Sequence, residues 1–421
     1  MEHEGEAGHG HGPPGTRLPR RVVWLLVAGV ALAALNLRTA ITSIGPLLDE
    51  ITAALDMSGV LAGALTTLPV LCFALFGALT PALIRRFGEH HVLVAALLAL
   101  AAGLATRPFV EDVWLFLGLS TLALSGGAIG NVLLPTLVKQ HFPRRVGAMT
   151  TLYTTFLALG TTIAAAATVP LEQASGDWRL ALGGYALLGL IAAVPWLLVL
   201  RHEPPRTDPA AALSLRRVLT TPMGWQSVLF FGSQSMVAYI MFGWYAQMLR
   251  DSGMDAAAAG LVLSYLTALA VPASLILPGI MARVRDHRGF VVLFFSCYAV
   301  GLAGLWLAPL KGVWLWTTLI GVGMATFPLA LTLFPLRTRT AAGTAAMSAS
   351  SQSIGYLMAG AGPFLFGLLR EVTGGWHLPL AMVMAVVTFN LFMGLLIGRP
   401  RYLEDQMEGR GLSRGASPPA R

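Results

Sequence analysis

An arginine lies inside the first long apolar stretch of the sequence. The stretch starts at Val22, contains Arg38 and continues to Leu48. A helix of about 17 residues rises about 25 Å, less than a bilayer core of about 30 Å. A cation at such depth costs about 2.5 to 3.5 kcal/mol and usually faces a protein interior or a wet cavity. Because guanidinium presents a planar fork of donors, Arg38 could recognise a flat anion or a nitro group. The alternative is that Arg38 snorkels to headgroups or pairs with a structural carbonyl.

Other polar side chains lie deep in apolar stretches and are further candidate ligands. Thr42 is one helical turn beyond Arg38 and shares its face, whereas Asn36 faces elsewhere and could serve helix packing instead. Gln352 and Tyr356 are four residues apart and share one face of a helix. For each of these side chains, packing is the competing interpretation. The candidate binding residues are Arg38, Asn36, Thr42, Asn131, Gln234, Tyr239, Gln352 and Tyr356.

A second arginine stands near the outer end of the third apolar stretch. Arg107 is followed by Glu111 and Asp112. We interpret it as a residue that pairs locally or snorkels, with a role in an outer vestibule as the alternative. Acidic residues fall in tails, loops or helix ends throughout the sequence. A proton relay through a buried carboxylate is therefore not expected.

The composition is that of a membrane protein. Of 421 residues, 56% are hydrophobic and 11% are charged, which is too apolar for an ordinary soluble domain. Cys72 and Cys297 lie in apolar stretches without regular spacing, so we expect neither a disulfide framework nor a metal site. We find no nucleotide-binding loop, metal motif or nucleophile elbow, and we expect neither an enzyme nor a bound cofactor.

Twelve apolar segments predict an all-α integral membrane fold with twelve transmembrane helices. Residues 201–222 form a polar linker that separates two six-helix bundles, at 21–200 and 223–398. Residues 1–20 are predicted to be a disordered tail and residues 399–421 a second tail. The segments are 22–48, 58–82, 90–108, 113–138, 147–170, 180–200, 223–249, 257–281, 290–310, 313–336, 343–369 and 376–398.

The basic residues indicate orientation. On the side of the linker and both tails lie 22 of the 28 Lys and Arg residues. The positive-inside rule then predicts both termini in the cytoplasm of a cell whose inner membrane holds the protein. The net charge of +8 is thereby explained by topology, and no nucleic-acid partner is expected. The expected partners are the lipid bilayer and a small-molecule substrate, and we expect a monomer.

The second half of the sequence repeats the first. A shift of 197 places Ala62-Gly63 on Ala259-Gly260, and a shift of 198 places Ala148-Met149 on Ala346-Met347. Parallel six-span repeats suggest two pseudo-symmetric bundles that rock about a central site. The repeat is asymmetric at one place, because Ser235 stands where the first half has Arg38.

Twelve spans in two such halves resemble the major facilitator superfamily. Residues 77–88, GALTPALIRRFG, resemble its cytoplasmic loop signature, with Pro81 in place of the usual aspartate. The resemblance implies a gating loop with Gly77, Arg85, Arg86 and Gly88. Residues 35–48, residues 327–332, and residues 352–356 together with 361–363 resemble the cyanate and 2-nitroimidazole permease family (CynX/NimT type).

This resemblance implies a secondary transporter working by alternating access. Its expected substrate is a small planar anion or a nitro-heteroaromatic compound such as cyanate or 2-nitroimidazole. The alternative is a multidrug-type exporter of apolar compounds, for which a Met-rich and aromatic cavity would be expected. A membrane-bound enzyme or sensor is a third class, against which the absence of a sizeable polar domain argues.

Overall fold

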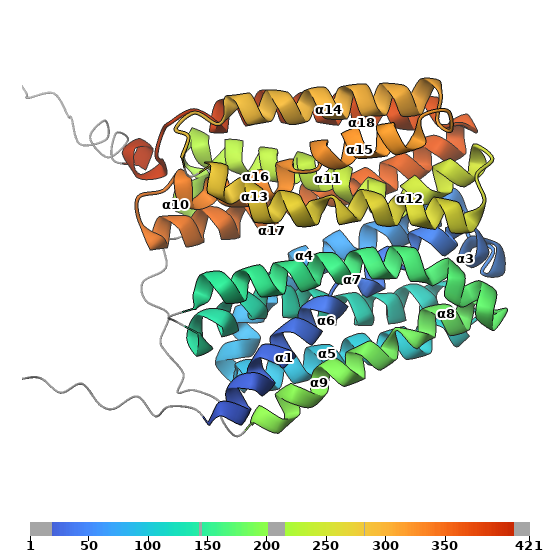
Figure 1. Ribbon diagram of the computed structural model, residues 1–421, viewed down its shortest axis with the longest axis horizontal. Coiled ribbons are helices and arrows are strands. Elements are labelled where there is room, and N and C mark those ends of the chain that lie inside the picture. The colour runs from blue at the N-terminus through green and yellow to red at the C-terminus, as the bar shows by residue number, and fades with distance from the viewer. Residues whose placement is uncertain (1–18, 143–144, 201–214, 282, 408–421) are drawn as a thin grey trace, which may run out of the picture.

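The computed structural model describes residues 19–142, 145–200, 215–281 and 283–407. Over these residues all regular secondary structure is helical, and 12 helical segments are long and apolar enough to cross a membrane. The N-terminal half forms one layer of Figure 1 and the C-terminal half forms the other. The prediction of an all-α fold with twelve spans in two bundles is confirmed.

The N-terminal half contains six spans, of which the first is broken into short pieces. These pieces are α1 (Arg20–Asn36), α2 (Thr39–Thr42), η1 (Gly45–Leu47) and α3 (Leu48–Ala54). The remaining spans are α4 (Gly59–Phe87), α5 (Glu89–Thr106) with η2 (Arg107–Phe109), α6 (Val113–His141), α7 (Val146–Ser175), and α8 (Trp178–Gly184) with α9 (Ala186–Val199).

The C-terminal half follows a short helix, α10 (Leu215–Leu219), which lies inside the expected linker. Residues 201–214 of that linker and residues 1–18 of the first tail lie outside the described residues. The spans are α11 (Pro222–Asp251), α12 (Ala256–Ala268) with α13 (Ala270–Met281), α14 (Arg288–Leu307), α15 (Val313–Gly323) with α16 (Thr326–Leu336), α17 (Ala341–Thr373) and α18 (His377–Ile397). Beyond α18, Leu403 is buried and its N–H donates to the carbonyl of Arg337 at 2.9 Å.

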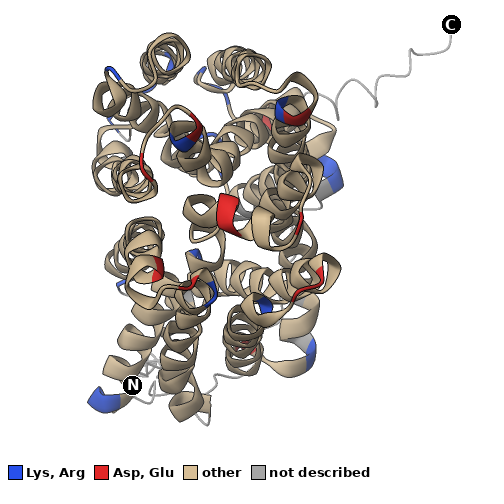
Figure 2. Ribbon diagram, turned by 90° about the vertical axis from the view of Figure 1, so that its right-hand side faces the viewer, with Lys and Arg blue, Asp and Glu red and all other residues tan. Residues whose placement is uncertain are grey.

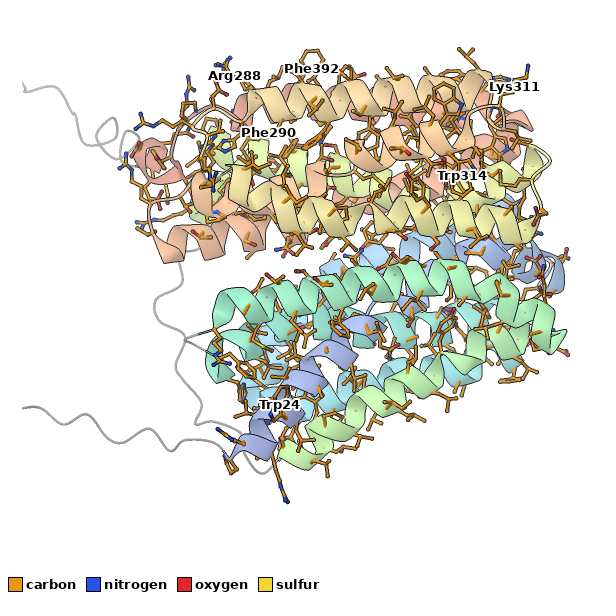
Figure 3. The ribbon with its side chains drawn as sticks, in the orientation of Figure 1. Trp24, Arg288, Phe290, Lys311, Trp314 and Phe392 are labelled. Carbon is orange, nitrogen blue, oxygen red and sulfur yellow. The ribbon has the colours of Figure 1, made fainter. Side chains whose placement is uncertain are left out.

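The bundle has two ends. We call the end where α1 begins and α10 lies the terminal end, and the opposite end, which holds α3, the far end (Figure 1). Large apolar side chains point outward from the helices, among them Trp24, which is 70% exposed, Trp314 and Phe392 (Figure 3). Such a surface fits a lipid environment, because exposed aromatic residues are costly in water and common at membrane interfaces.

The helix ends repeat between the halves, as the sequence shift predicts. Ser58 caps α4 by accepting a hydrogen bond from the Leu61 N–H, and Asp255, 197 residues later, caps α12 in the same way. Gly176 ends α7 with φ of 69° and Gly374, 198 residues later, ends α17 with φ of 65°. Both glycines adopt the left-handed conformation that terminates helices. The pseudo-symmetry therefore extends to individual caps.

Glycines on α6 and α7 let these helices approach the broken first span closely. A Cβ added at Gly160 would lie 1.8 Å from the carbonyl oxygen of Leu35, and one added at Gly127 would lie 2.9 Å from that of Leu37. Because both contacts are with backbone atoms, no side chain can move to make room. The close approach therefore positions the backbone immediately before Arg38.

Replacing Gly160 by alanine is expected to lower the thermal unfolding temperature of the detergent-solubilised protein. The added methyl group would overlap the Leu35 carbonyl, and overpacking of this kind typically costs about 1 to 3 kcal/mol. The matched control is Gly118→Ala in α6, where an added Cβ meets nothing within 4 Å. Equal unfolding temperatures for the two variants would contradict the importance of this contact.

Candidate functional site

The first span breaks at Arg38 because side chains near it satisfy backbone groups locally. The Thr39 hydroxyl donates to the carbonyl and to the side-chain oxygen of Asn36, each at 2.8 Å, and the Thr42 hydroxyl donates to the Arg38 carbonyl at 3.0 Å. Pro46, which has no N–H, stands in the next turn. Short polar side chains and proline both weaken a continuous helix. Arg38 thus stands between α1 and α2 and belongs to neither.

The Arg38 side chain is buried between the two halves without a compensating charge. It is 8% exposed, and its Nε has no hydrogen-bond partner among the described residues. Nor does Arg38 form an ion pair with any residue that the structure describes. Its guanidinium carbon lies 5.9 Å from the ring centroid of Phe73 in α4, within the range of a cation–π interaction. The predicted location of Arg38 in the protein interior is what the structure shows.

An aromatic cluster surrounds this guanidinium, with members from both halves. We define it as Phe73, Phe231, Tyr239, Phe242 and Tyr356. The Phe73 ring stacks on Tyr356 of α17 at 5.4 Å and lies 6.4 Å from Tyr239 of α11, and the two tyrosine rings are 6.2 Å apart. Tyr356 also meets Phe231 edge to face at 5.1 Å. These ring contacts join side chains of the two halves beside Arg38.

The two tyrosines are positioned to act together with Arg38. Both rings contact Phe73, the ring beside the Arg38 guanidinium. The Tyr239 hydroxyl is buried and has no hydrogen-bond partner among the described residues. A buried donor without a partner is costly and invites a ligand.

Other predicted site residues make different contacts. The Gln234 amide donates to the Ser235 hydroxyl at 2.7 Å, and the Gln352 amide donates to the Ser348 hydroxyl at 2.8 Å. Asn131 is half-buried on α6, one turn beyond Gly127 and so on the side of the helix that faces the break. These three amides lie on helices that border the site, and two of them are already engaged within their own helix.

Asn36 faces away from the aromatic cluster. Its Nδ2 lies against Gly189 of α9, where an added Cβ would be 3.0 Å from it. Ser233, its counterpart in the repeat, accepts a hydrogen bond at 2.8 Å from Asn390 of α18. Both residues thus contact the last span of their own half, which favours the packing interpretation for Asn36. The Thr42 hydroxyl is likewise occupied, by the Arg38 carbonyl.

The expected gating loop is largely helical. Gly77 lies within α4, where an added Cβ would contact only Val132 of α6, at 3.6 Å. Arg86 is exposed near the end of α4, with its guanidinium 5.2 Å from the Phe87 ring centroid. Gly88 alone separates α4 from α5, with φ of 86°. The side chain of Arg85 lies outside the described residues. The expected spans 58–82 and 90–108 left residues 83–89 between them, and the helices narrow this connection to Gly88. The gating role of Gly77, Arg85, Arg86 and Gly88 stays a prediction.

Sequence reasoning missed Phe73 and misplaced Arg107. Phe73 is one of 19 phenylalanines in the sequence, and nothing in its spacing marks it. Arg107 neither snorkels nor pairs with Glu111 or Asp112, because it is 0% exposed and forms no ion pair with a described residue. Asp112 instead caps α6 by accepting from the Leu115 N–H at 2.7 Å. The Asp112 carboxylate therefore binds the first turn of its own helix and not Arg107.

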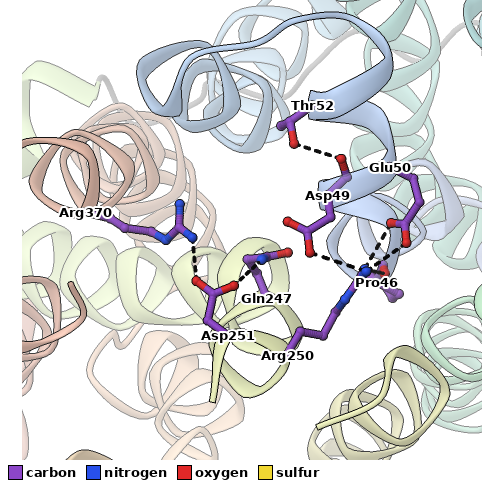
Figure 4. A network of polar contacts seen from close by, with 8 residues as sticks. All are labelled: Pro46, Asp49, Glu50, Thr52, Gln247, Arg250, Asp251 and Arg370. Carbon is purple, nitrogen blue, oxygen red and sulfur yellow. Dashed lines mark hydrogen bonds and ion pairs between the residues drawn. The ribbon is translucent and has the colours of Figure 1, made fainter. Parts of the chain in front are cut away.

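Charged residues join the two halves at the far end, in a group that we call the latch. Arg250 of α11 binds both carboxylate oxygens of Glu50 at 2.8 and 3.0 Å, and donates to the Pro46 carbonyl at 3.1 Å. Its other ion pair, with Asp49, is 3.3 Å long (Figure 4). Beside it, Arg370 of α17 pairs with Asp251 (Figure 4). Figure 2, which views this end, shows an acidic segment between the two groups of helices.

The latch is accompanied by backbone contacts. Glu371 of α17 accepts a hydrogen bond from the Val60 N–H of α4 at 2.7 Å. A Cβ added at Gly45 would lie 2.4 Å from the Phe242 carbonyl in α11. Toward the middle of the bundle, Ser264 donates to the Thr162 carbonyl at 3.0 Å. The halves are thus held together from the middle of the bundle to the far end.

Two bundles of membrane-crossing helices that enclose a polar site at their interface define a membrane transporter. A family model described as Major Facilitator Superfamily matches residues 26–363. The chain belongs to the Major Facilitator Superfamily, whose transporters are not enzymes, and it is a multi-pass inner-membrane protein.

Relatives and solved structures agree with this assignment. The chain is 36% identical to a 2-nitroimidazole transporter of Escherichia coli (strain K12) over 380 residues, 90% of this chain and 96% of the relative. It is 28% identical to the cyanate transport protein CynX of the same bacterium over 348 residues, 82% of this chain and 90% of the relative. A crystal structure of a bacterial homolog to the human lysosomal transporter Spinster superposes with a TM-score of 0.71 at 16% identity, covering 96% of this chain and 100% of that one. The resemblance to cyanate and 2-nitroimidazole permeases is confirmed.

Substitution of Glu50 by glutamine is expected to loosen the far end. The change keeps the shape of the side chain but removes the charge that binds Arg250, which is worth about 1 to 3 kcal/mol for a partly buried pair. We expect a cysteine introduced by Thr66→Cys to react about 10-fold faster with a membrane-impermeant thiol reagent added at the far side. The control is Glu172→Gln, at the far end of α7 and outside the latch. Unchanged labelling in Glu50→Gln would show that the latch does not hold this end closed.

Proposed function

We propose that this transporter moves a small planar anion or a nitro-heteroaromatic compound, such as cyanate or 2-nitroimidazole, by alternating access. Arg38 binds the electron-rich group of the substrate, and Phe73, Tyr239 and Tyr356 enclose its flat body. Asn131, Gln234 and Gln352 border this site and complete the proposed set of polar contacts.

The observation that carries the proposal is the uncompensated guanidinium of Arg38. A buried cation normally has an anionic partner because its desolvation is costly. Among the described residues, no carboxylate pairs with Arg38. We therefore propose that an anionic or electron-rich substrate is its missing partner. The fork geometry of guanidinium favours a planar group with two acceptor positions.

The names of two relatives support the same chemistry. Cyanate and 2-nitroimidazole are both small and flat, and each offers electron-rich atoms to a guanidinium. Both could turn one edge toward Arg38 and one face toward an aromatic ring. The multidrug alternative calls for a large apolar cavity with a Met-rich and aromatic lining. The site shares the aromatic character, but its guanidinium and two phenols are better suited to a polar planar solute.

The site can respond to substrate because its walls belong to different halves. Arg38 and Phe73 come from the N-terminal half, and Tyr239 and Tyr356 from the C-terminal half. A ligand that binds both halves stabilises their approach, and the latch closes the far end while substrate exchanges at the terminal end. We propose that the terminal end is cytoplasmic, because basic residues are concentrated there.

Coupling follows from the position of the acidic residues. All aspartates and glutamates lie in tails, loops or at helix ends. We therefore propose facilitation, exchange, or proton symport in which the substrate itself carries the proton. In none of these is a carboxylate relay required.

Replacing Arg38 is expected to remove substrate binding. Purified wild-type protein should be stabilised against heat by cyanate and by 2-nitroimidazole and should take them up into liposomes. Arg38→Ala should lose both effects, and Arg38→Lys should bind about 10- to 100-fold more weakly, because a lysine keeps the charge but loses the bidentate geometry. The matched control is Arg179→Gln, outside the site on α8. Normal transport by both Arg38 variants would make this arginine structural and would favour the exporter alternative.

Removal of the Tyr239 hydroxyl is expected to weaken substrate binding without lowering the stability of the free protein. Because this hydroxyl has no hydrogen-bond partner among the described residues, Tyr239→Phe should leave the unfolding temperature of the free protein unchanged or slightly raised. Substrate affinity should fall about 5- to 10-fold through loss of one hydrogen bond. The control is Tyr245→Phe, whose hydroxyl binds Thr317 at 2.7 Å, and which should be destabilised. Unaltered affinity in Tyr239→Phe would exclude this hydroxyl from the site.

A further inference from the structure

Arg107 is a second buried cation, separate from Arg38 in the sequence and in its surroundings. It opens η2 at the far end of α5, and its side chain is 0% exposed. Its Nη1 donates to the Ala40 carbonyl over a long distance of 3.5 Å, while Nε and Nη2 have no partner among the described residues. Structural stabilisation by one long hydrogen bond is small compared with the cost of burying a guanidinium.

Arg107 is among the residues that line a small cavity between the two halves. The cavity has a volume of about 10 Å³, room for about one water molecule. Its walls are mostly apolar, and the hydroxyl of Thr66 in its wall donates to carbonyls of its own helix at 3.0 and 3.1 Å. Tyr239 lines this cavity and also belongs to the aromatic cluster around Arg38. The two arginines therefore share one neighbour, whose hydroxyl lacks a partner within the described structure.

The cavity is small because the halves meet tightly beside it. A Cβ added at Gly243, in the cavity wall, would lie 2.8 Å from Thr66 of the opposite half. Nearby, a Cβ added at Gly45 would lie only 2.4 Å from the Phe242 carbonyl oxygen. Both contacts lie on the side of the bundle that the latch holds closed. Separation of the halves at the far end must therefore widen the cavity and expose Arg107.

We propose that Arg107 forms a second anion-binding subsite, which is occupied when the far end is open. It binds a small planar anion through its two free N–H edges before or after the anion occupies the Arg38 site, and Tyr239 lies between the two positions. The inference rests on the proposed function, because it takes the same class of substrate. It adds a second binding position, which the anion reaches from the far side only.

The test separates the two subsites by locking the far end. Gly59→Cys and Glu371→Cys place a disulfide across the contact between α4 and α17, because a Cβ added at Gly59 would lie 3.0 Å from that of Glu371 and the two Cβ atoms therefore face each other. In this locked form only the Arg38 site can be reached. In this locked protein, cyanate binding measured by thermal stabilisation should be unchanged by Arg107→Gln and lost in Arg38→Gln. In the unlocked protein, Arg107→Gln should raise the KM for cyanate uptake from the far side about 10-fold or more, with the maximal rate nearly unchanged.

Controls keep a structural role distinguishable. Arg179→Gln, at the same end of the bundle but outside the cavity, should leave both measurements unchanged. Arg107→Lys keeps the charge and should raise the far-side KM by a smaller factor, and it decides the question if Arg107→Gln fails to fold. An unchanged far-side KM in Arg107→Lys and Arg107→Gln would overturn the proposal. So would equal losses of binding in the locked and unlocked forms, since Arg107 would then merely support α2.

A failure of the proposed function would look different. If locked wild-type protein is not stabilised by cyanate and unlocked wild-type protein does not transport it, the substrate class is wrong and the inference falls with it. If wild type binds and transports cyanate while the Arg107 variants behave as wild type, only the second subsite is rejected.

Discussion

The burial of a guanidinium without a counter-charge is the constraint on which the rest of this structure depends. A membrane helix satisfies its own backbone groups, but it cannot satisfy a cation in its middle. The protein meets this constraint by breaking the first span at Arg38 and by placing the side chain against aromatic faces from both halves. The ring quadrupoles offset part of the desolvation cost. A bound ligand could offset the rest of that cost.

Different kinds of interaction stabilise the break in the first span and the closed far end. The break uses threonine hydroxyls, a proline and the close approach of Gly160 and Gly127, all of which act over short distances. The far end uses the ion pairs of Arg250 with Glu50 and Asp49, which can separate into water. Packing of glycine on backbone is rigid, whereas partly exposed ion pairs exchange readily with solvent. A rigid site and a reversible closure are what alternating access requires.

The repeat explains why equivalent residues differ in role. Asn36 and Ser233 occupy matching positions and each contacts the last span of its own half. Arg38 and Ser235 also match, yet only Arg38 carries a charge, and Ser235 accepts a hydrogen bond from Gln234 instead. The symmetric pair maintains packing within a bundle, and the asymmetric pair distinguishes the two bundles at their interface. A charge on one side only suits a small ligand that bridges the halves.

The sequence by itself determined the membrane class, the twelve spans, the repeat and the presence of a cation inside the first span, because hydropathy and a cation in an apolar stretch are local signals. It also led to the correct family through the motifs around residues 35–48. Only the tertiary structure decided that Tyr239 and Tyr356 meet Arg38, that Phe73 joins them, and that Arg107 turns inward and away from Asp112. These outcomes depend on how helices distant in sequence are rotated against one another. The spacing of polar residues along the sequence does not fix which polar face of a helix turns inward. The packing of the two halves fixes it.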